Sequence, residues 1–139
     1  MTAALVPELD VTDIEASLAF YAEVLGFQVR YARPQEGFVD LVRDGAELML
    51  EAAAGPGRRF RTAPLKVPFG RGVNMQIRVR DTRALLAAAR VAGAVIVLDL
   101  EDRWYRTADG EVGNRQFVVA DPDGYLLRFF EDLGFRPVA

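Results

Sequence analysis

The chain has 139 residues, of which 51% are hydrophobic and 27% charged, and its formal net charge at pH 7 is −3. This composition is that of one ordinary globular domain, and it argues against a disordered chain and against a basic nucleic-acid-binding surface. No apolar run approaches the roughly 18 residues of a membrane-spanning helix, and the first residues lack the pattern of a signal peptide. We therefore expect a cytoplasmic protein without nucleic-acid or membrane partners.

The chain contains no cysteine and no histidine. The absence of cysteine excludes disulfides, thiol nucleophiles and thiolate metal sites. The absence of histidine removes the usual general base, the usual activator of a serine nucleophile and the commonest metal ligand. Most hydrolase and zinc-enzyme chemistries are thereby excluded.

The first half of the chain predicts a strand, a helix and then three strands. The first strand is expected over residues 5–11. Thr12-Asp13-Ile14-Glu15 fits a capping box with Thr12 as the N-cap, and Gly26 supplies the helix stop. Strands are then predicted over 27–32, 38–43 and 46–51, and Asp44-Gly45 predicts a hairpin turn between the last two.

Residues 54–72 are rich in glycine, proline and arginine, and this composition predicts a linker. Four basic residues within it, Arg58, Arg59, Arg61 and Lys66, are expected to be solvated rather than to form a nucleic-acid-binding patch.

The second half repeats the order of elements. Strict apolar–polar alternation predicts a strand over 73–80, Asp81 opens a helix that ends at Gly93, and strands follow at 94–98, 116–120 and 125–131. Residues 99–115, which include Trp104 and Tyr105, are predicted to be irregular. The repeat predicts an α+β fold of two βαβββ modules in a single domain, 1–139, with module one at 1–53, the linker at 54–72 and module two at 73–139.

Two stretches resemble the vicinal oxygen chelate superfamily. They are residues 13–21 followed by Val24-Leu25-Gly26-Phe27, and residues 117–131 with Asp121-Pro122-Asp123-Gly124-Tyr125 at their centre. This superfamily contains glyoxalases, extradiol dioxygenases and bleomycin resistance proteins. The resemblance implies curved sheets around a cavity and, in the enzymes, four inward side chains that bind a divalent metal. The corresponding residues here are Val6, Met49, Asn74 and Arg128.

These four residues do not suit a divalent cation, which prefers anionic oxygens or imidazole. Valine has no donor atom, methionine is soft and uncharged, and Arg128 carries a fixed positive charge. We therefore expect no metal and no cofactor. An atypical metal site that recruits Glu8, Glu47 or Glu51 from the neighbouring positions remains an alternative.

Within this superfamily, the group without metal ligands is the bleomycin-resistance-like group, whose members are homodimers that sequester a ligand. The resemblance therefore implies a non-catalytic small-molecule-binding protein of the antibiotic-resistance type, in a homodimer. The expected ligand is planar, aromatic or cationic, and no catalytic residue is assigned. The predicted ligand-binding residues lie on cavity-facing strand positions or are aromatic residues expected in a loop: Phe38, Asp40, Glu47, Met49, Asn74, Gln76, Arg78, Trp104, Tyr105 and Arg128.

Two other functions stay open, and so does the role of Arg128. The chain could be a metal-free enzyme in which Glu47 or Glu51 is the general base and Arg128 or Asn74 stabilises an oxyanion. It could instead be a regulatory or partner-binding module. Arg128 itself is expected either to pair internally with a carboxylate of Glu8, Glu47 or Glu51, which is the favoured interpretation, or to bind a ligand's acid group.

Overall fold

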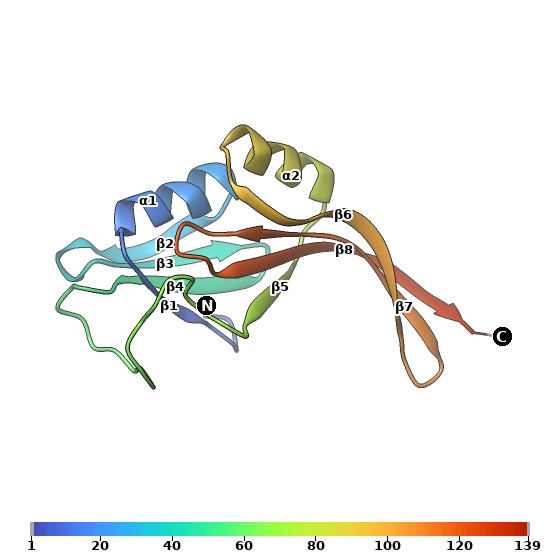
Figure 1. Ribbon diagram of the computed structural model, residues 1–139, viewed down its shortest axis with the longest axis horizontal. Coiled ribbons are helices and arrows are strands. Elements are labelled where there is room, and N and C mark those ends of the chain that lie inside the picture. The colour runs from blue at the N-terminus through green and yellow to red at the C-terminus, as the bar shows by residue number, and fades with distance from the viewer. Residues whose placement is uncertain (1, 139) are drawn as a thin grey trace. The chain divides into compact units, whose positions relative to one another are not determined.

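The computed structural model describes residues 2–138, which form two compact units (Figure 1). Unit 1 comprises the chain up to Phe69 together with the turn Pro122–Gly124, and unit 2 comprises Gly70–Asp121 and the residues from Tyr125 onward.

Unit 1 is a four-stranded sheet with a helical segment on one face. In chain order it contains β1 (Glu8–Val11), α1 (Ile14–Ala19), a π-helical turn (Phe20–Val24), β2 (Gln28–Arg33), a short 3₁₀ turn (Pro34–Glu36), β3 (Phe38–Arg43) and β4 (Ala46–Ala52). The strand order is β1-β4-β3-β2, in which β1 runs parallel to β4 and the other neighbours are antiparallel.

Unit 2 repeats this topology with longer strands. It contains β5 (Asn74–Arg78), α2 (Thr82–Val91), β6 (Val95–Arg106), β7 (Gly110–Ala120) and β8 (Leu126–Pro137). The strand order is β5-β8-β7-β6, and β5 runs parallel to β8. The predicted α+β fold of two βαβββ modules is therefore confirmed.

In each unit the apolar core lies between the helix and one face of the sheet. On β4, Leu48 and Leu50 are buried in this core, while the intervening Met49 points to the opposite face. On β7 and β8, Phe117 and Phe129 are fully buried and their rings pack 5.6 Å apart. Because side chains alternate along a strand, the face of each sheet away from its helix is left for polar residues.

The start of α1 differs by one residue from the prediction. Asp13, rather than Thr12, is the N-cap, and its Oδ1 accepts hydrogen bonds from the N–H groups of Glu15 and Ala16, both at 3.1 Å. Thr12 instead donates its hydroxyl to Asp123 over 2.6 Å. The predicted capping box is wrong because tertiary contact with Asp123 takes the threonine hydroxyl. At α2, Asp81 is the N-cap as predicted.

The prediction that residues 99–115 are irregular is wrong. Strands β6 and β7 pair as far as Arg106 and Glu111, so Trp104 and Tyr105 lie in a strand. The error has a physical cause: this part of the ribbon carries polar residues on both faces and therefore lacks an apolar period of two. Its charges pair across strands, as in the two hydrogen bonds of 2.8 and 3.0 Å from Arg115 to Asp102.

Two arginines of the predicted linker contact unit 1, although Arg61 is exposed as predicted and only Arg59 is half-buried. Arg61 donates to Asp10 of β1 over 3.0 Å and to the Ala53 carbonyl over 2.9 Å. Arg59, only 16% exposed, donates to the carbonyls of Ala52 and Gly57. These contacts attach the segment after β4 to the edge of the unit 1 sheet. Arg58 and Lys66 are exposed, as predicted.

A carboxylate from β8 supports the first turn of α2. Glu131 accepts hydrogen bonds from the hydroxyl of Thr82 over 2.6 Å and from its backbone N–H over 2.9 Å. Both bonds favour the ionised form, and they hold the pKa of Glu131 below its usual range.

Glu131→Gln should therefore destabilise the protein at neutral pH and have less effect in acid. Since the pKa is lower in the folded chain, the stabilisation is complete above the pKa of an unfolded glutamate, about 4.3, and is lost as pH falls through the folded value. We expect a loss of about 1 kcal/mol at pH 7 in urea denaturation, because the carboxylate is partly exposed, and a smaller loss at pH 3. Glu23→Gln, at an exposed position, is the control. The same loss at both pH values would contradict this account.

Candidate functional site

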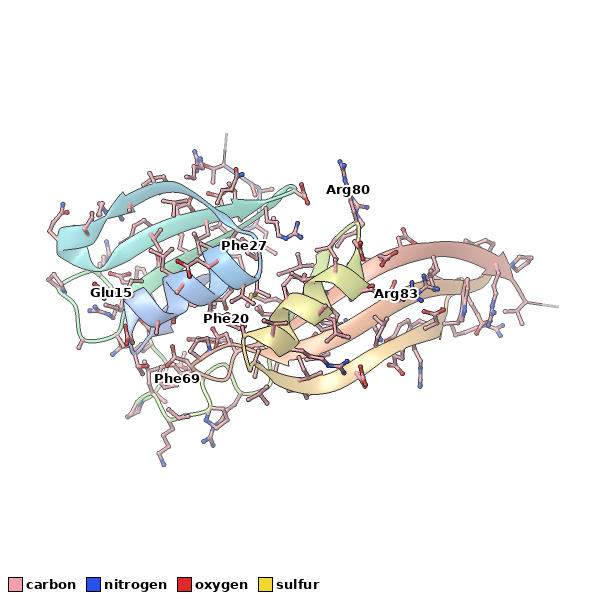
Figure 2. The ribbon with its side chains drawn as sticks, turned by 90° about the horizontal axis from the view of Figure 1, so that it is seen from above. Glu15, Phe20, Phe27, Phe69, Arg80 and Arg83 are labelled. Carbon is pink, nitrogen blue, oxygen red and sulfur yellow. The ribbon has the colours of Figure 1, made fainter. Side chains whose placement is uncertain are left out.

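A hollow of about 330 Å³ lies on the face of the unit 2 sheet away from α2. Figure 2 shows unit 2 from the side of α2, on which Arg83 is labelled, so this face is on the far side of the unit 2 sheet. The hollow is built from all four strands because alternate side chains of each strand point toward it. Its lining consists of Asn74, Val97, Leu98, Glu101, Arg103, Tyr105, Gln116, Val118, Leu126 and Arg128.

A buried amide forms the polar centre of this hollow. Gln116 is 2% exposed, and its Nε2 donates to the Tyr105 hydroxyl oxygen over 2.6 Å and to Glu101 over 3.4 Å. The side-chain Nδ2 of Asn114 donates to the side-chain Oε1 of Gln116 over 3.5 Å. Sequence reasoning did not assign Gln116 to the site. The available signal was its place next to Phe117 in a predicted strand. Because Phe117 faces the core, Gln116 faces the opposite side of the sheet.

Arg128 lies in the same hollow and has an uncharged partner. Its Nη2 donates to the Oε1 of Gln76, the neighbouring residue across β5 and β8. Its Nε is buried and has no hydrogen-bond partner among the described residues. Within unit 2, the partner of this guanidinium is the side-chain amide of Gln76 rather than a carboxylate.

The other predicted residues of β5 share the face of the hollow. Asn74 lines it, and Gln76 and Arg78 follow at alternate positions of the same strand, all three with exposed side chains. The structure therefore brings Asn74, Gln76 and Arg128 together with Tyr105.

Trp104 and Tyr105 do not border one cleft. As adjacent strand residues they point to opposite faces, and only Tyr105 lines the hollow. The Trp104 indole lies on Gly113, where a Cβ would be 2.8 Å from the ring. The guanidinium of Arg136 stacks 4.0 Å from the centre of the indole. The prediction that Trp104 and Tyr105 border the same cleft is therefore wrong. Strand β6 is extended here, so the two adjacent side chains point to opposite faces.

The predicted residues of unit 1 lie on the equivalent face of its sheet, where charges are paired. Arg30 donates to Glu47 over 2.9 Å and to the fully buried Asp40 over 3.3 Å. Phe38 is buried beneath Arg33, whose guanidinium lies 3.9 Å from the ring centre. Met49 lies beside Glu8 of β1.

These contacts shift the carboxyl pKa values in opposite directions. Burial, together with the nearby Glu47, raises the pKa of Asp40. The backbone N–H of Ala3, 2.6 Å from its Oε1, and the guanidinium of Arg30 lower the pKa of Glu47. Glu47 is therefore ionised and forms an ion pair with Arg30. Because its charge is neutralised by this arginine, Glu47 offers less attraction to a cationic ligand than we expected from the sequence.

The residues at the superfamily's metal-binding positions do not fit a divalent metal. Arg128 presents a cation to the hollow and Asn74 a neutral amide, whereas Met49 and Val6 present a thioether and an alkyl group. Among residues 2–138 no three or more Asp or Glu side chains are grouped so that they could hold a metal ion.

The two βαβββ units and the polar faces of their sheets define a protein of the glyoxalase and bleomycin-resistance fold class. The family model described as a glyoxalase-like domain matches residues 8–130. The chain belongs to this family, within the vicinal oxygen chelate superfamily.

The relatives include proteins named for antibiotic resistance or binding. The bleomycin resistance proteins of Geobacillus stearothermophilus and Staphylococcus aureus are 27% identical over 135 residues, which cover 92% of this chain and 96% of theirs. TioX from Micromonospora sp. ML1 is 24% identical, with a TM-score of 0.74 over 95% of this chain and 100% of its own. TnmS3, an antibiotic binding protein from Streptomyces sp. CB03234, is 21% identical, with a TM-score of 0.63 over 95% and 97%. These two structures share the fold.

None of the helices in residues 2–138 is long and apolar enough to span a membrane.

Proposed function

We propose that this protein binds a small molecule without transforming it, and that the hollow of unit 2 forms part of the binding site. The observation that carries the proposal is the hydrogen bond between the buried Gln116 and the half-buried Tyr105 in a hollow with apolar walls. Sites of this kind, mostly apolar with a few fixed polar groups, are typical of small-molecule recognition. The similarity to bleomycin resistance proteins supports the same class of function.

The ligand of this proposal has a planar body that packs on Tyr105. An aromatic side chain held by a hydrogen bond gives stacking area at low entropic cost. Binding requires no metal, and the protein acts as a cytoplasmic homodimer. Exposed apolar side chains of the unit 2 strands, such as Phe135 and Val112, support association with a second chain.

The alternative of acid–base catalysis is less well supported by the geometry. A general base needs a pKa near the working pH, whereas Arg30 and the Ala3 N–H lower the pKa of Glu47. Glu51 is buried and covered by the segment after β4, since a Cβ on Gly57 would lie 1.5 Å from its Oε1. A substrate has no open approach to that carboxylate within unit 1.

Tyr105→Ala should weaken binding of a planar probe about tenfold or more, while Trp104→Ala should leave it nearly unchanged. The expected size is that of a stacking contact, about 1–3 kcal/mol. The measurement is calorimetric titration with bleomycin and with the neutral probe naphthalene-2-carboxamide, with and without a chelator. The chelator should have no effect.

The Trp104 variant is the matched control, because it removes an adjacent aromatic side chain on the opposite face. Equal losses in the two variants would contradict the assignment of the hollow as the site. The absence of saturable binding by both probes would contradict the proposed function.

A further inference from the structure

The hollow of unit 2 has a charge balance opposite to that of the chain. Its lining includes the guanidinium groups of Arg103 and Arg128 against the single carboxylate of Glu101. Arg78 adds a further guanidinium on the same face of β5. The chain as a whole carries a net charge of −3. A locally positive hollow in an acidic protein favours an anionic group on the ligand.

Arg128 differs from Arg115 and Arg30 in the chemistry of its hydrogen-bond partner. Arg115 forms two hydrogen bonds to the carboxylate of Asp102, and Arg30 contacts the carboxylates of both Asp40 and Glu47. The guanidinium of Arg128 donates to the neutral amide of Gln76, and its Nε is buried without a partner in the described part of the chain. A guanidinium has five N–H donors arranged to match a carboxylate, so this arginine retains donors for an anion.

A second donor lies in the same hollow. The hydroxyl oxygen of Tyr105 accepts the hydrogen bond from Gln116, which leaves the hydroxyl proton free to be donated to a ligand oxygen. Around these polar groups the walls are apolar, formed by Val97, Leu98, Val118 and Leu126. The combination calls for a ligand with an apolar body and an acid group.

We infer that the hollow of unit 2 takes a planar organic acid, whose carboxylate is bound by the guanidinium of Arg128 and whose body lies between Tyr105 and the apolar wall. This inference rests on the proposed function and replaces the cationic ligand expected from the acidic composition. The role of Arg128 is that of a specificity-determining residue at a position where the superfamily's enzymes hold a metal ligand.

The test uses three probes of nearly equal shape that differ in charge: naphthalene-2-carboxylate, naphthalene-2-carboxamide and the naphthalen-2-ylmethylammonium ion. Calorimetric titration of the wild type should show the carboxylate binding at least tenfold more tightly than the other two. Added salt should weaken binding of the carboxylate more than that of the amide, because the attraction between charges is screened.

Arg128→Met should remove the preference for the carboxylate, so that the carboxylate and the carboxamide bind this variant with affinities within about twofold of each other. Arg128→Lys should keep part of the preference, because the charge remains but the two-pronged geometry is lost. Arg115→Met is the control, since that guanidinium is already matched by Asp102. Thermal unfolding of each variant verifies that it is folded.

Each outcome separates the inference from the proposed function. If the carboxamide or the ammonium ion binds as tightly as the carboxylate, or if Arg128→Met keeps the preference, the inference is wrong and the binding function stands. If none of the three probes binds, the inference is wrong, and the proposed function is overturned only if bleomycin also fails to bind.

Discussion

Replacing Phe129 by alanine should lower the free energy of unfolding by about 3–5 kcal/mol. Phe129 is fully buried on the helix-facing side of β8, and its ring lies 5.6 Å from that of Phe117 on β7. Truncation removes the transfer energy of the ring and leaves a cavity among residues that strand pairing holds in place. Urea denaturation followed by circular dichroism measures the loss.

Phe135→Ala provides the matched control for this prediction. Phe135 lies on the same strand and is 57% exposed, so its removal should cost less than about 1 kcal/mol. Similar losses for the two variants would mean that the core of unit 2 is not centred on Phe117 and Phe129. The comparison bears on the site because Phe129 directly follows Arg128, and packing of one side chain on the core orients the other toward the hollow.

Gly124→Ala should cost about 2–5 kcal/mol. Gly124 has a φ of 97°, in the left-handed region, where a Cβ alone costs about 1–2 kcal/mol. The new Cβ would also lie 2.5 Å from the Cβ of Pro68 and 2.9 Å from its Cα. The backbone would have to move apart, which typically costs a further ~1–3 kcal/mol. Chemical denaturation is again the measurement.

Gly134→Ala separates the two contributions to this loss. Gly134 has a φ of 90°, but a Cβ there would meet no atom within 4 Å. We expect this variant to lose only the conformational part, about 1–2 kcal/mol. If Gly124→Ala costs no more than Gly134→Ala, the close approach of Pro68 has no energetic importance.

Local patterns in the sequence were sufficient to predict the order of elements. Strand β5 lies within the predicted residues 73–80 because apolar and polar side chains alternate there, as expected for the two faces of a half-buried strand. Asp81 caps α2 as predicted, since an N-cap depends on contacts within one turn of chain. Repetition of this order in both halves predicted the two βαβββ modules.

Predictions failed where the deciding contacts join residues far apart in the chain. Thr12 does not cap α1 because its hydroxyl donates to Asp123. Residues 99–106 form part of β6 because β7 supplies hydrogen bonds and opposite charges, although neither face has an apolar period. Arg59 and Arg61 fold back onto Asp10 for the same reason.

The same distinction between local patterns and contacts distant in the chain applies to the candidate site. The sequence by itself determined which side chains of the predicted strands face away from the helices, among them Asn74 and Arg128, and that these two positions carry neither a carboxylate nor an imidazole. Only the tertiary structure decided that Trp104 points away from Tyr105, that Gln116 lies between the site's polar groups, and that Arg128 is bound to an amide. The physical reason is that alternation along a strand is a local property, whereas the partner of a polar side chain depends on which strands lie next to each other and in which register.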